Sequence, residues 1–235
     1  MQNAMARCDS EQRKTILEAA IRVFSESGLN GAVVRQVAEA AGVNSALLYY
    51  YFENKEILFQ ETVKLVISGL LDQFQATRKE FASGCERISF LVDGLWDYYT
   101  RHPERMRLMA VANIMHPETI AKILPGLARE RVLLPLEILE EGIRRGELKR
   151  MHPLQLWWSI LGTCFFRLFM KKARMQMDYE LKASGMPVFD DDRQQIKSLV
   201  MEGVVAIRWE PDSPGRLAAP VAVGQATPGQ ILDLK

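Results

Sequence analysis

The sequence predicts an all-α protein with a small N-terminal three-helix domain and a larger C-terminal helical domain. Apolar residues recur at the three- and four-residue spacing of helices along most of the 235 residues, and no run alternates with period two for long enough to indicate a sheet. Hydrophobic residues make up 48% of the chain and charged residues 25%, which suits a buried core beneath a solvated surface. We place the domains at 1–53 and 54–210, followed by a Pro-, Gly- and Ala-rich tail at 211–235 that we expect to be disordered.

The segment from Val34 to Tyr51 has the spacing of a helix-turn-helix. Gly42 can adopt the left-handed backbone that ends a first short helix, and Asn44 is a suitable N-cap for a second helix over 45–51. Two short helices joined by such a turn can place the second one in the major groove of DNA. From spacing alone, an ordinary pair of core helices explains the pattern about equally well. The residues that would bury the two helices against each other are Val34, Val37, Ala38, Ala41 and Leu48.

Neighbouring segments supply a helix on either side of this motif. Asp9 or Ser10 can cap the preceding helix, with Gln12 placed three residues after Asp9 as in a capping box and Gly28 at the helix end. Downstream, Asn54 can cap the next helix. The first three helices would form the N-terminal domain.

The run from Gly28 to Leu58, GLNGAVVRQVAEAAGVNSALLYYYFENKEIL, resembles the DNA-binding domain of the TetR/AcrR family of bacterial transcriptional regulators. The matching residues are Gly28, Arg35, Val37, Ala38, Ala41, Gly42, Val43, Leu48, Tyr49, Tyr51, Phe52, Lys55 and Glu56. The resemblance implies a homodimer that binds a double-stranded DNA operator through the helix-turn-helix. It also implies a C-terminal domain that holds a small-molecule effector, whose binding changes the separation of the two DNA-reading domains.

Two features depart from the family pattern. Family members usually carry Thr or Ser where this chain has Val33, and that hydroxyl caps the helix and touches a phosphate. Their recognition helix commonly begins with a basic residue followed by Gly-Thr, whereas this chain has Ser45-Ala46-Leu47. Ser45 can still donate a hydrogen bond, and Ala46 and Leu47 can meet thymine methyl groups. For Leu47, simple core packing is an equally good interpretation.

Our candidates for the DNA-binding site are Val33 (through its backbone), Arg35, Asn44, Ser45, Ala46, Leu47, Tyr49, Tyr50 and Lys55. Tyr49, Tyr50 and Lys55 are predicted to contact phosphates, and Arg35 with the start of the recognition helix to approach base edges. Residues 1–60 hold six basic and seven acidic side chains, a net charge of −1, and the whole chain has a net charge of +1. We therefore expect DNA binding to depend on helix N-termini, tyrosine hydroxyls and a few cations, with a shallow dependence on salt.

The remainder of the chain is predicted to be helical, at 54–82, 85–100, 104–114, 118–124, 127–145, 153–177 and 192–209. Within this part, residues 154–170 are apolar on nearly every side, although Gln155 and Arg167 interrupt the stretch and argue against a membrane span. A helix of this kind needs a partner on two faces. We expect it to form a four-helix homodimer interface together with the last helix, as the resemblance also implies for the last two main helices.

Large, adaptable apolar side chains are candidates for lining an effector pocket. They are Phe74, Trp96, Tyr99, Met106, Met109, Met115, Phe165 and Phe169. Each of them taken singly is more often ordinary core, so the pocket is predicted mainly by their number. The ligand it would suit is small and hydrophobic or aromatic.

Enzymatic motifs do not occur in the sequence, so we predict neither catalysis nor a cofactor nor a metal site. His102, His116 and His152 each precede a proline, a pattern typical of helix starts. Three cysteines without a C-x-x-C pair and a polar N-terminus without a signal-peptide pattern predict a cytoplasmic protein. The sequence thus favours a homodimeric, ligand-responsive repressor with a palindromic operator. Two alternatives stay open: an activator or architectural DNA-binding protein without an effector, and a ligand-binding protein with altered or lost operator recognition.

Overall fold

A computed structural model describes residues 2–130, 134–184 and 192–204 of the chain. In this part of the chain every regular element is a helix, so the all-α prediction is confirmed. The helices are α1 (Gln2–Gly31), α2 (Val34–Ala41), α3 (Ser45–Tyr51), α4 (Lys55–Ala76), α5 (Gly84–Arg101), α6 (Pro103–Met115), α7 (Pro117–Glu130), α8 (Leu134–Arg144), α9 (Pro153–Phe169), α10 (Lys171–Ala183) and α11 (Asp192–Val204).

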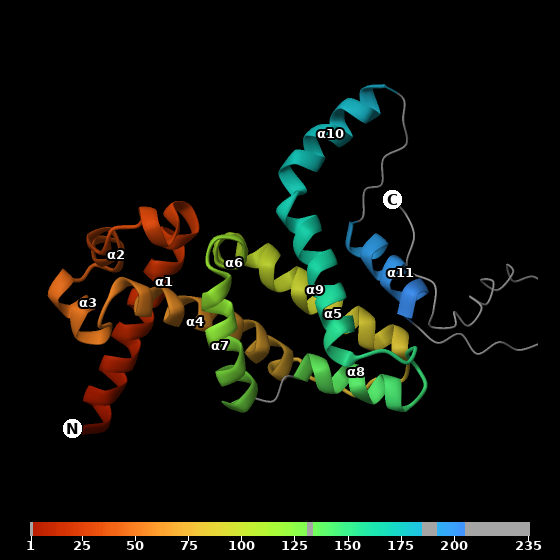
Figure 1. Cartoon of the computed structure of the whole chain (residues 1–235), viewed down its shortest axis with the longest axis horizontal. Coiled ribbons are helices and arrows are strands. Elements are labelled where there is room, and N and C mark those ends of the chain that lie inside the picture. The colour runs from red at the N-terminus through yellow and green to blue at the C-terminus, as the bar shows by residue number, and fades with distance from the viewer. Residues whose placement is uncertain (1, 131–133, 185–191, 205–235) are drawn as a thin grey trace, which may run out of the picture.

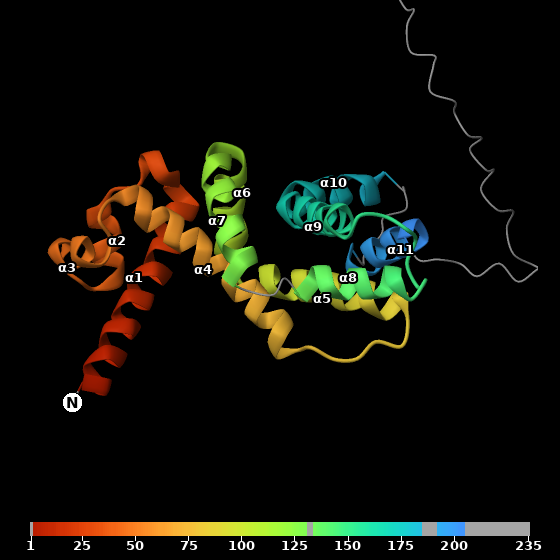
Figure 2. The ribbon, with the colours of Figure 1, turned by 60° about the horizontal axis from the view of Figure 1, so that its bottom comes forward.

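The helices form a small N-terminal group and a larger C-terminal group, joined by α4 and α6. Helices α1, α2 and α3 lie together at one end of the molecule, and α5, α8, α9 and α11 lie at the other (Figures 1 and 2). Helix α6 stands between the two groups and packs extensively against α1 (Figure 2). Helix α4 contacts both groups, since it packs on α1 and on α5. A change in the position of α6 would therefore shift α1, on which it packs.

One continuous hydrophobic core runs through both groups. It extends from Ile16 in α1 through Phe59 in α4 and Leu95 in α5 to Ile160 in α9 and Ile196 in α11. Because the core is continuous, the N-terminal group is not an independently packed unit but shares buried contacts with α4 and α6. Among the described helices, none is long and apolar enough to cross a membrane.

The turn and cap residues identified in the sequence have the expected local geometry. Gly42 adopts a left-handed conformation with φ of 67°, which ends α2. The side chain of Asn44 accepts a hydrogen bond from the Leu47 amide at 2.7 Å, and that of Asn54 accepts one from the Ile57 amide at 2.8 Å. Both asparagines are thus N-caps as predicted.

The first helix begins earlier than predicted. Helix α1 starts at Gln2, so Asp9 and Ser10 lie within it and the predicted capping box with Gln12 is wrong. Asp9 instead accepts a hydrogen bond from the Tyr51 hydroxyl of α3, a tertiary contact that short-range patterns do not reveal. Gly28 has non-helical backbone, with φ of 64° and ψ of −179°, so the regular helix ends there as predicted and a short helical segment follows the kink up to Gly31.

Three predicted helix boundaries in the C-terminal part are also wrong. The helix predicted to run to residue 82 ends at Ala76, and its C-cap Thr77 leaves the helical conformation with φ of −107° and ψ of 9°. Helix α7 continues through Pro125 to Glu130, so residues 127–130 belong to it and not to α8. The helix predicted over 153–177 breaks at Met170 into α9 and α10, where apolar residues give way to charged ones.

Part of the C-terminal prediction lies outside the described residues. Helix α11 is described as far as Val204, whereas we predicted the last helix to reach residue 209. The tail predicted at 211–235 is likewise not covered by the description, so its expected disorder stays a prediction.

Candidate functional site

The turn between α2 and α3 is closed by backbone hydrogen bonds and by two buried side chains. The Val43 amide donates to the Ala38 carbonyl at 2.9 Å and the Gly42 amide donates to the Glu39 carbonyl at 3.1 Å. Ala38 and Leu48 are buried, and each lies on the side of its helix that faces the core. The small side chain of Ala38 leaves room for α3 to approach, which fixes α3 on the outside of the molecule.

Helix α3 presents one exposed stripe to solvent. Ala46, Tyr49 and Tyr50 are exposed at positions i, i+3 and i+4, and the Tyr50 side chain is the most open of the three at 76%. Ser45 and Leu47 are half-buried at the edge of this stripe. A helix of seven residues with one core face and one open aromatic face can enter a groove of a nucleic acid without disturbing its own packing.

Val33 leaves α2 without a side-chain cap, and Gln36 supplies part of what is missing. Val33 is the N-cap residue, in an extended conformation, and its side chain is 56% exposed. The Gln36 side-chain carbonyl accepts a hydrogen bond from the Val33 amide at 3.0 Å, which is the second half of a capping box. Gln36 was not among the candidate residues, although a Gln three residues after an N-cap position is a recognisable signal.

Lys55 and Arg35 are the two cationic side chains near the start of α2, and they differ in whether a carboxylate neutralises them. The Lys55 ammonium donates to the Ala32 carbonyl at 3.2 Å, which places it near the N-terminus of α2. The Arg35 guanidinium forms an ion pair with Glu39 at 3.1 Å on the same helix. Because Glu39 offsets the charge of Arg35, Lys55 is the stronger candidate for a phosphate contact.

A cavity of about 580 Å³ opens among the helices of the C-terminal part. Its lining comes from α4 to α9 and is almost wholly apolar, and none of the lining side chains is charged. The lining residues are Ile67, Leu70, Leu71, Tyr99, Met109, Asn113, Ile120, Leu124, Pro125, Leu127, Pro135, Leu136, Leu154, Trp157, Trp158, Leu161, Gly162 and Phe165. This volume is within the range of sites for small organic ligands.

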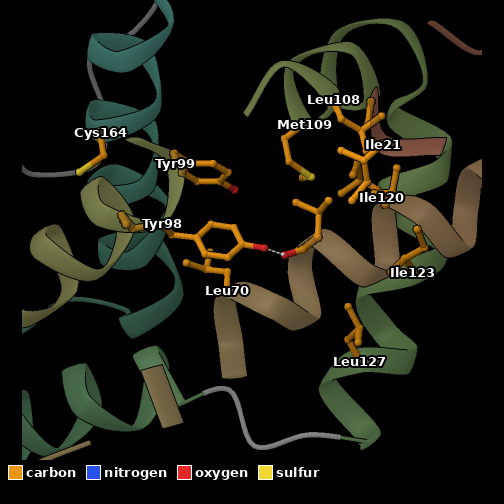
Figure 3. Close-up of a cluster of buried hydrophobic side chains, with 14 of the residues drawn as sticks. Ile21, Leu70, Tyr98, Tyr99, Leu108, Met109, Ile120, Ile123, Leu127 and Cys164 are labelled. Atoms are coloured by element: carbon orange, nitrogen blue, oxygen red, sulfur yellow. Dashed lines mark hydrogen bonds between the residues drawn. The ribbon is translucent and has the colours of Figure 1, made fainter. Parts of the chain in front are cut away.

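Three of the eight predicted pocket residues line this cavity: Tyr99, Met109 and Phe165. In Figure 3, Tyr99 and Met109 face each other from α5 and α6. The other five do not line it. Phe74 lies behind the wall, with its ring 6.0 Å from that of Trp157, and Phe169 is half exposed and stacks on Phe165.

The remaining three face other surroundings. Met115 is exposed at the end of α6, Met106 is half-buried, and Trp96 lies 6.0 Å from the Arg193 guanidinium of α11. The sequence analysis missed the contributions of α7 and α8, because their apolar residues are ordinary in composition. The residues of α7 and α8 line the cavity only because these two helices pack around it.

A polar network connects the wall of the cavity to α1. The Tyr98 hydroxyl donates to the Val66 carbonyl at 2.8 Å and accepts from Arg105 at 2.9 Å (Figure 3 shows the first of these bonds). Arg105 also bonds the Glu18 carboxylate of α1 at 2.8 Å. The approach of Tyr98 and Arg105 requires Gly69, because a Cβ there would lie 2.7 Å from the Tyr98 oxygen.

Burial and charge act in opposite directions on this network. Burial raises the pKa of Tyr98, while the nearby Arg105 charge opposes that rise. Burial by itself would lower the pKa of Arg105, but its contacts with Tyr98 and Glu18 raise it instead. Arg105 therefore stays charged and Tyr98 stays protonated, which are the states that both hydrogen bonds need.

Helices α9 and α11 leave an apolar face open to solvent. On α9, Phe166 and Phe169 are exposed, and Phe166 is 64% exposed, whereas the exposed Trp158 borders the cavity. On α11, Leu199 is exposed. Gly203 on α11 has open space where a Cβ would be, so another helix could approach it closely.

Comparison with known families finds matches over both groups of helices. A family model described as bacterial regulatory proteins of the tetR family matches residues 16–62. A second, described as a tetracyclin repressor-like C-terminal domain, matches residues 85–182. The first match covers α2 and α3 and reaches into α4, beyond the boundary predicted at residue 53. The second covers most of the cavity.

Relatives with assigned roles are transcriptional regulators. The chain is 37% identical over 202 residues to the HTH-type transcriptional repressor KstR2 of Rhodococcus jostii, covering 84% of this chain and 93% of KstR2. It is 32% identical over 137 residues to the HTH-type transcriptional repressor NicS of Pseudomonas putida, covering 57% of this chain and 64% of NicS. The chain thus matches a little less than two thirds of the length of NicS.

Solved structures show the same fold. A TetR-family transcriptional regulator from Haemophilus influenzae superimposes with a TM-score of 0.66 at 15% identity, over 84% of this chain and 98% of that one. The regulator FadR from Bacillus subtilis, solved in complex with stearoyl-CoA, superimposes with a TM-score of 0.61 at 22% identity, over 80% and 95%. At such identities the likeness shows the fold alone.

Replacing Val33 by Thr should stabilise the protein. The new hydroxyl can accept a hydrogen bond from the Gln36 amide and complete the capping box, so we expect the free energy of unfolding to rise by about 0.5–2 kcal/mol. Urea unfolding followed by circular dichroism measures the change. Val33→Ala, which shortens the side chain without adding an acceptor, is the control. An equal stability of the Thr and Ala variants would contradict the capping argument.

Replacing Arg105 by Met should destabilise the protein, because the hydrogen bonds to Tyr98 and Glu18 are lost together. We expect a loss of roughly 1.5–3 kcal/mol in the free energy of unfolding, the range for hydrogen bonds to charged groups. Arg101→Met, on the exposed side of α5, should change it by less than about 0.5 kcal/mol. If both variants unfold at the same urea concentration, the network contributes nothing to holding α6 against α1.

Proposed function

The chain belongs to the TetR family of bacterial transcriptional regulators, and from this we propose that it is a homodimeric repressor that leaves a palindromic operator when a small, largely apolar ligand occupies its cavity. The observation that carries the proposal is the combination of an exposed recognition stripe on α3 and an uncharged cavity joined to α1 through α6. The stripe on α3 suits a DNA groove, and the cavity suits a ligand. Helix α6 contacts both the cavity and α1, so a shift of α6 can pass from one site to the other.

DNA binding is assigned to the exposed side of α3 and its surroundings. Ala46 and Tyr49 would face the major groove or its edge, and Lys55 would neutralise a phosphate beside the N-terminus of α2. Ser45 and Leu47 would take part at the margin of the stripe, since both keep some exposure. Asn44 keeps its side chain on the Leu47 amide, so its part is to hold the start of α3. The N-terminal residues carry little net charge, which predicts modest non-specific binding.

Ligand response is assigned to α6. Met109 and Asn113 of this helix line the cavity, while Arg105 bonds Glu18 of α1 and Val111 lies against Gly28. A ligand that prefers one position of α6 would therefore bias the position of the DNA-reading helices. A coupling free energy of about 1–3 kcal/mol would change operator affinity roughly 5- to 150-fold.

The homodimer is assigned to the open face of α9 and α11. Its exposed aromatic side chains and Gly203 suit close packing against the same face of a second copy. Two-fold symmetry would then present two α3 helices to successive turns of DNA, about 34–36 Å apart. The palindromic operator follows from this symmetry.

Selection of bound fragments from genomic DNA by the purified protein tests the proposal directly. We expect a palindrome with half-sites about one helical turn apart to be enriched. Selection of random sequence, or of none, would overturn operator recognition and favour an architectural or a purely ligand-binding protein.

Replacing Lys55 by Ala should weaken binding to the selected operator and to random DNA by the same factor, because a phosphate contact carries no sequence information. The slope of log K against log salt should become shallower by about 1. Fluorescence anisotropy at several salt concentrations measures both quantities. Lys122→Ala, which removes an exposed charge of α7, should change neither, and an unaltered slope for Lys55→Ala would refute the assignment.

Replacing Phe166 by Glu should convert the dimer to a monomer. Each buried phenylalanine contributes about 1.5–3 kcal/mol and symmetry counts it twice, so we expect the dimer dissociation constant to rise by about three orders of magnitude. Sedimentation equilibrium measures the constant, and operator binding should fall with it. Ile114→Glu, an equally exposed apolar site on α6, is the control. Wild-type protein that is monomeric at micromolar concentration would end the homodimer proposal.

A further inference from the structure

Tyr99 places a buried hydroxyl at the wall of the cavity. The residue is on α5, only 5% of its surface is exposed, and it is part of the cavity lining. Figure 3 shows its ring extending from α5 with the hydroxyl toward Met109 of α6. The ring is held by edge contacts with Tyr98 and Phe165, whose centroids lie 5.3 Å and 6.3 Å away. Its position is therefore fixed by packing.

The hydroxyl of Tyr99 has no hydrogen-bond partner among the residues that the structure describes. Its neighbour Tyr98 differs in this respect, because that hydroxyl bonds both the Val66 carbonyl and Arg105. Among the described residues, the fully buried side-chain polar atoms without a partner are on Arg105 and Arg174, so the Tyr99 hydroxyl keeps access to the cavity and can donate a hydrogen bond there. Burial raises the pKa of Tyr99 above its ordinary value, so the group remains a neutral donor.

The lining holds few other polar groups. They are the side-chain amide of Asn113, whose nitrogen donates to the Met109 carbonyl at 2.8 Å, and the indole N–H groups of Trp157 and Trp158. None of the lining residues is charged. A carboxylate or an ammonium placed inside would lose its hydration without gaining a counter-charge, which is strongly unfavourable.

We propose that Tyr99 selects the ligand, and that the ligand is an apolar molecule carrying one neutral hydrogen-bond acceptor, such as a ketone or ester carbonyl, that faces this hydroxyl. The inference rests on the proposed function, because it names the chemical class of the ligand at the same site. The apolar part of the molecule fills the space between α4, α6 and α9, and the carbonyl accepts a hydrogen bond from the Tyr99 hydroxyl. Tyr99 thus fixes the orientation as well as the class of the ligand.

Three matched probes test this assignment in calorimetric titrations of the full-length protein: benzophenone, diphenylmethane and 4-benzoylbenzoate. They share two rings, with a carbonyl in the first, none in the second and an added carboxylate in the third. We expect benzophenone to bind roughly 2- to 12-fold more tightly than diphenylmethane, the range for one hydrogen bond, and 4-benzoylbenzoate to bind more weakly than benzophenone. Equal affinities of the first two probes, the carboxylate as the tightest ligand, or binding of none would overturn the proposal.

Variants distinguish the hydroxyl from the general shape of the cavity. Tyr99→Phe should abolish the preference for benzophenone over diphenylmethane while diphenylmethane binds as before. The melting temperature of the ligand-free variant should not fall, since the change removes a hydroxyl that bonds no described residue. Tyr179→Phe, which deletes an exposed hydroxyl on α10, should keep the preference. A preference that persists in Tyr99→Phe would refute the role of the residue.

The outcome can be separated from that of the proposed function. If benzophenone shows the preference but leaves the DNA complex unchanged, the ligand class stands and the ligand-responsive part of the proposed function fails. If DNA is released by compounds that show no dependence on Tyr99, the proposed function stands and this inference fails.

Discussion

The Arg105 guanidinium is the point at which the two groups of helices are held together. It extends from α6 to the Tyr98 hydroxyl of α5 and the Glu18 carboxylate of α1, while Tyr98 bonds the backbone of α4. Four helices thus meet at one charge, and the approach is close enough that only a glycine fits at position 69. Because charged, directional contacts have few alternative arrangements, α6 is located accurately between the cavity and α1. This junction adds directional contacts to the apolar packing by which α6 connects the cavity to α1.

The nearly neutral N-terminal domain can be reconciled with DNA binding through the geometry of α3. Its exposed stripe carries two tyrosines, and the helix starts of α2 and α4 lie near Lys55. Helix N-termini and hydroxyl groups bind phosphates at defined positions, whereas a broad positive field binds any DNA. A domain of this kind contacts DNA phosphates at defined positions but attracts DNA only weakly from a distance. At the start of α2, Val33 provides no side-chain cap. The hydrogen bond from the Val33 amide to the Gln36 side chain supplies part of the missing stabilisation.

Helix α9 shows how one element can serve three environments. Leu156, Ile160 and Cys164 face the core, Trp157 and Phe165 border the cavity, and Phe166 lies on the open face. The apolar surface all round the helix is explained by these three neighbours. The arrangement also places the proposed dimer interface and the cavity on the same rigid helix. A ligand and a second copy would consequently both act on its position.

The sequence by itself determined the helical class, the turn at Gly42 and the caps at Asn44 and Asn54, because each depends on atoms within three or four residues of one another. It also determined the family, since the residues of the helix-turn-helix are contiguous. Only the tertiary structure decided which apolar side chains border the cavity. Helical periodicity predicts that Phe74 and Phe165 are both buried. Only the packing of the six helices around the cavity places Phe165 in its lining and Phe74 behind it. The link from Tyr98 through Arg105 to Glu18 was decided in the same way, because its members are far apart in the chain and meet only when α1, α5 and α6 are packed together.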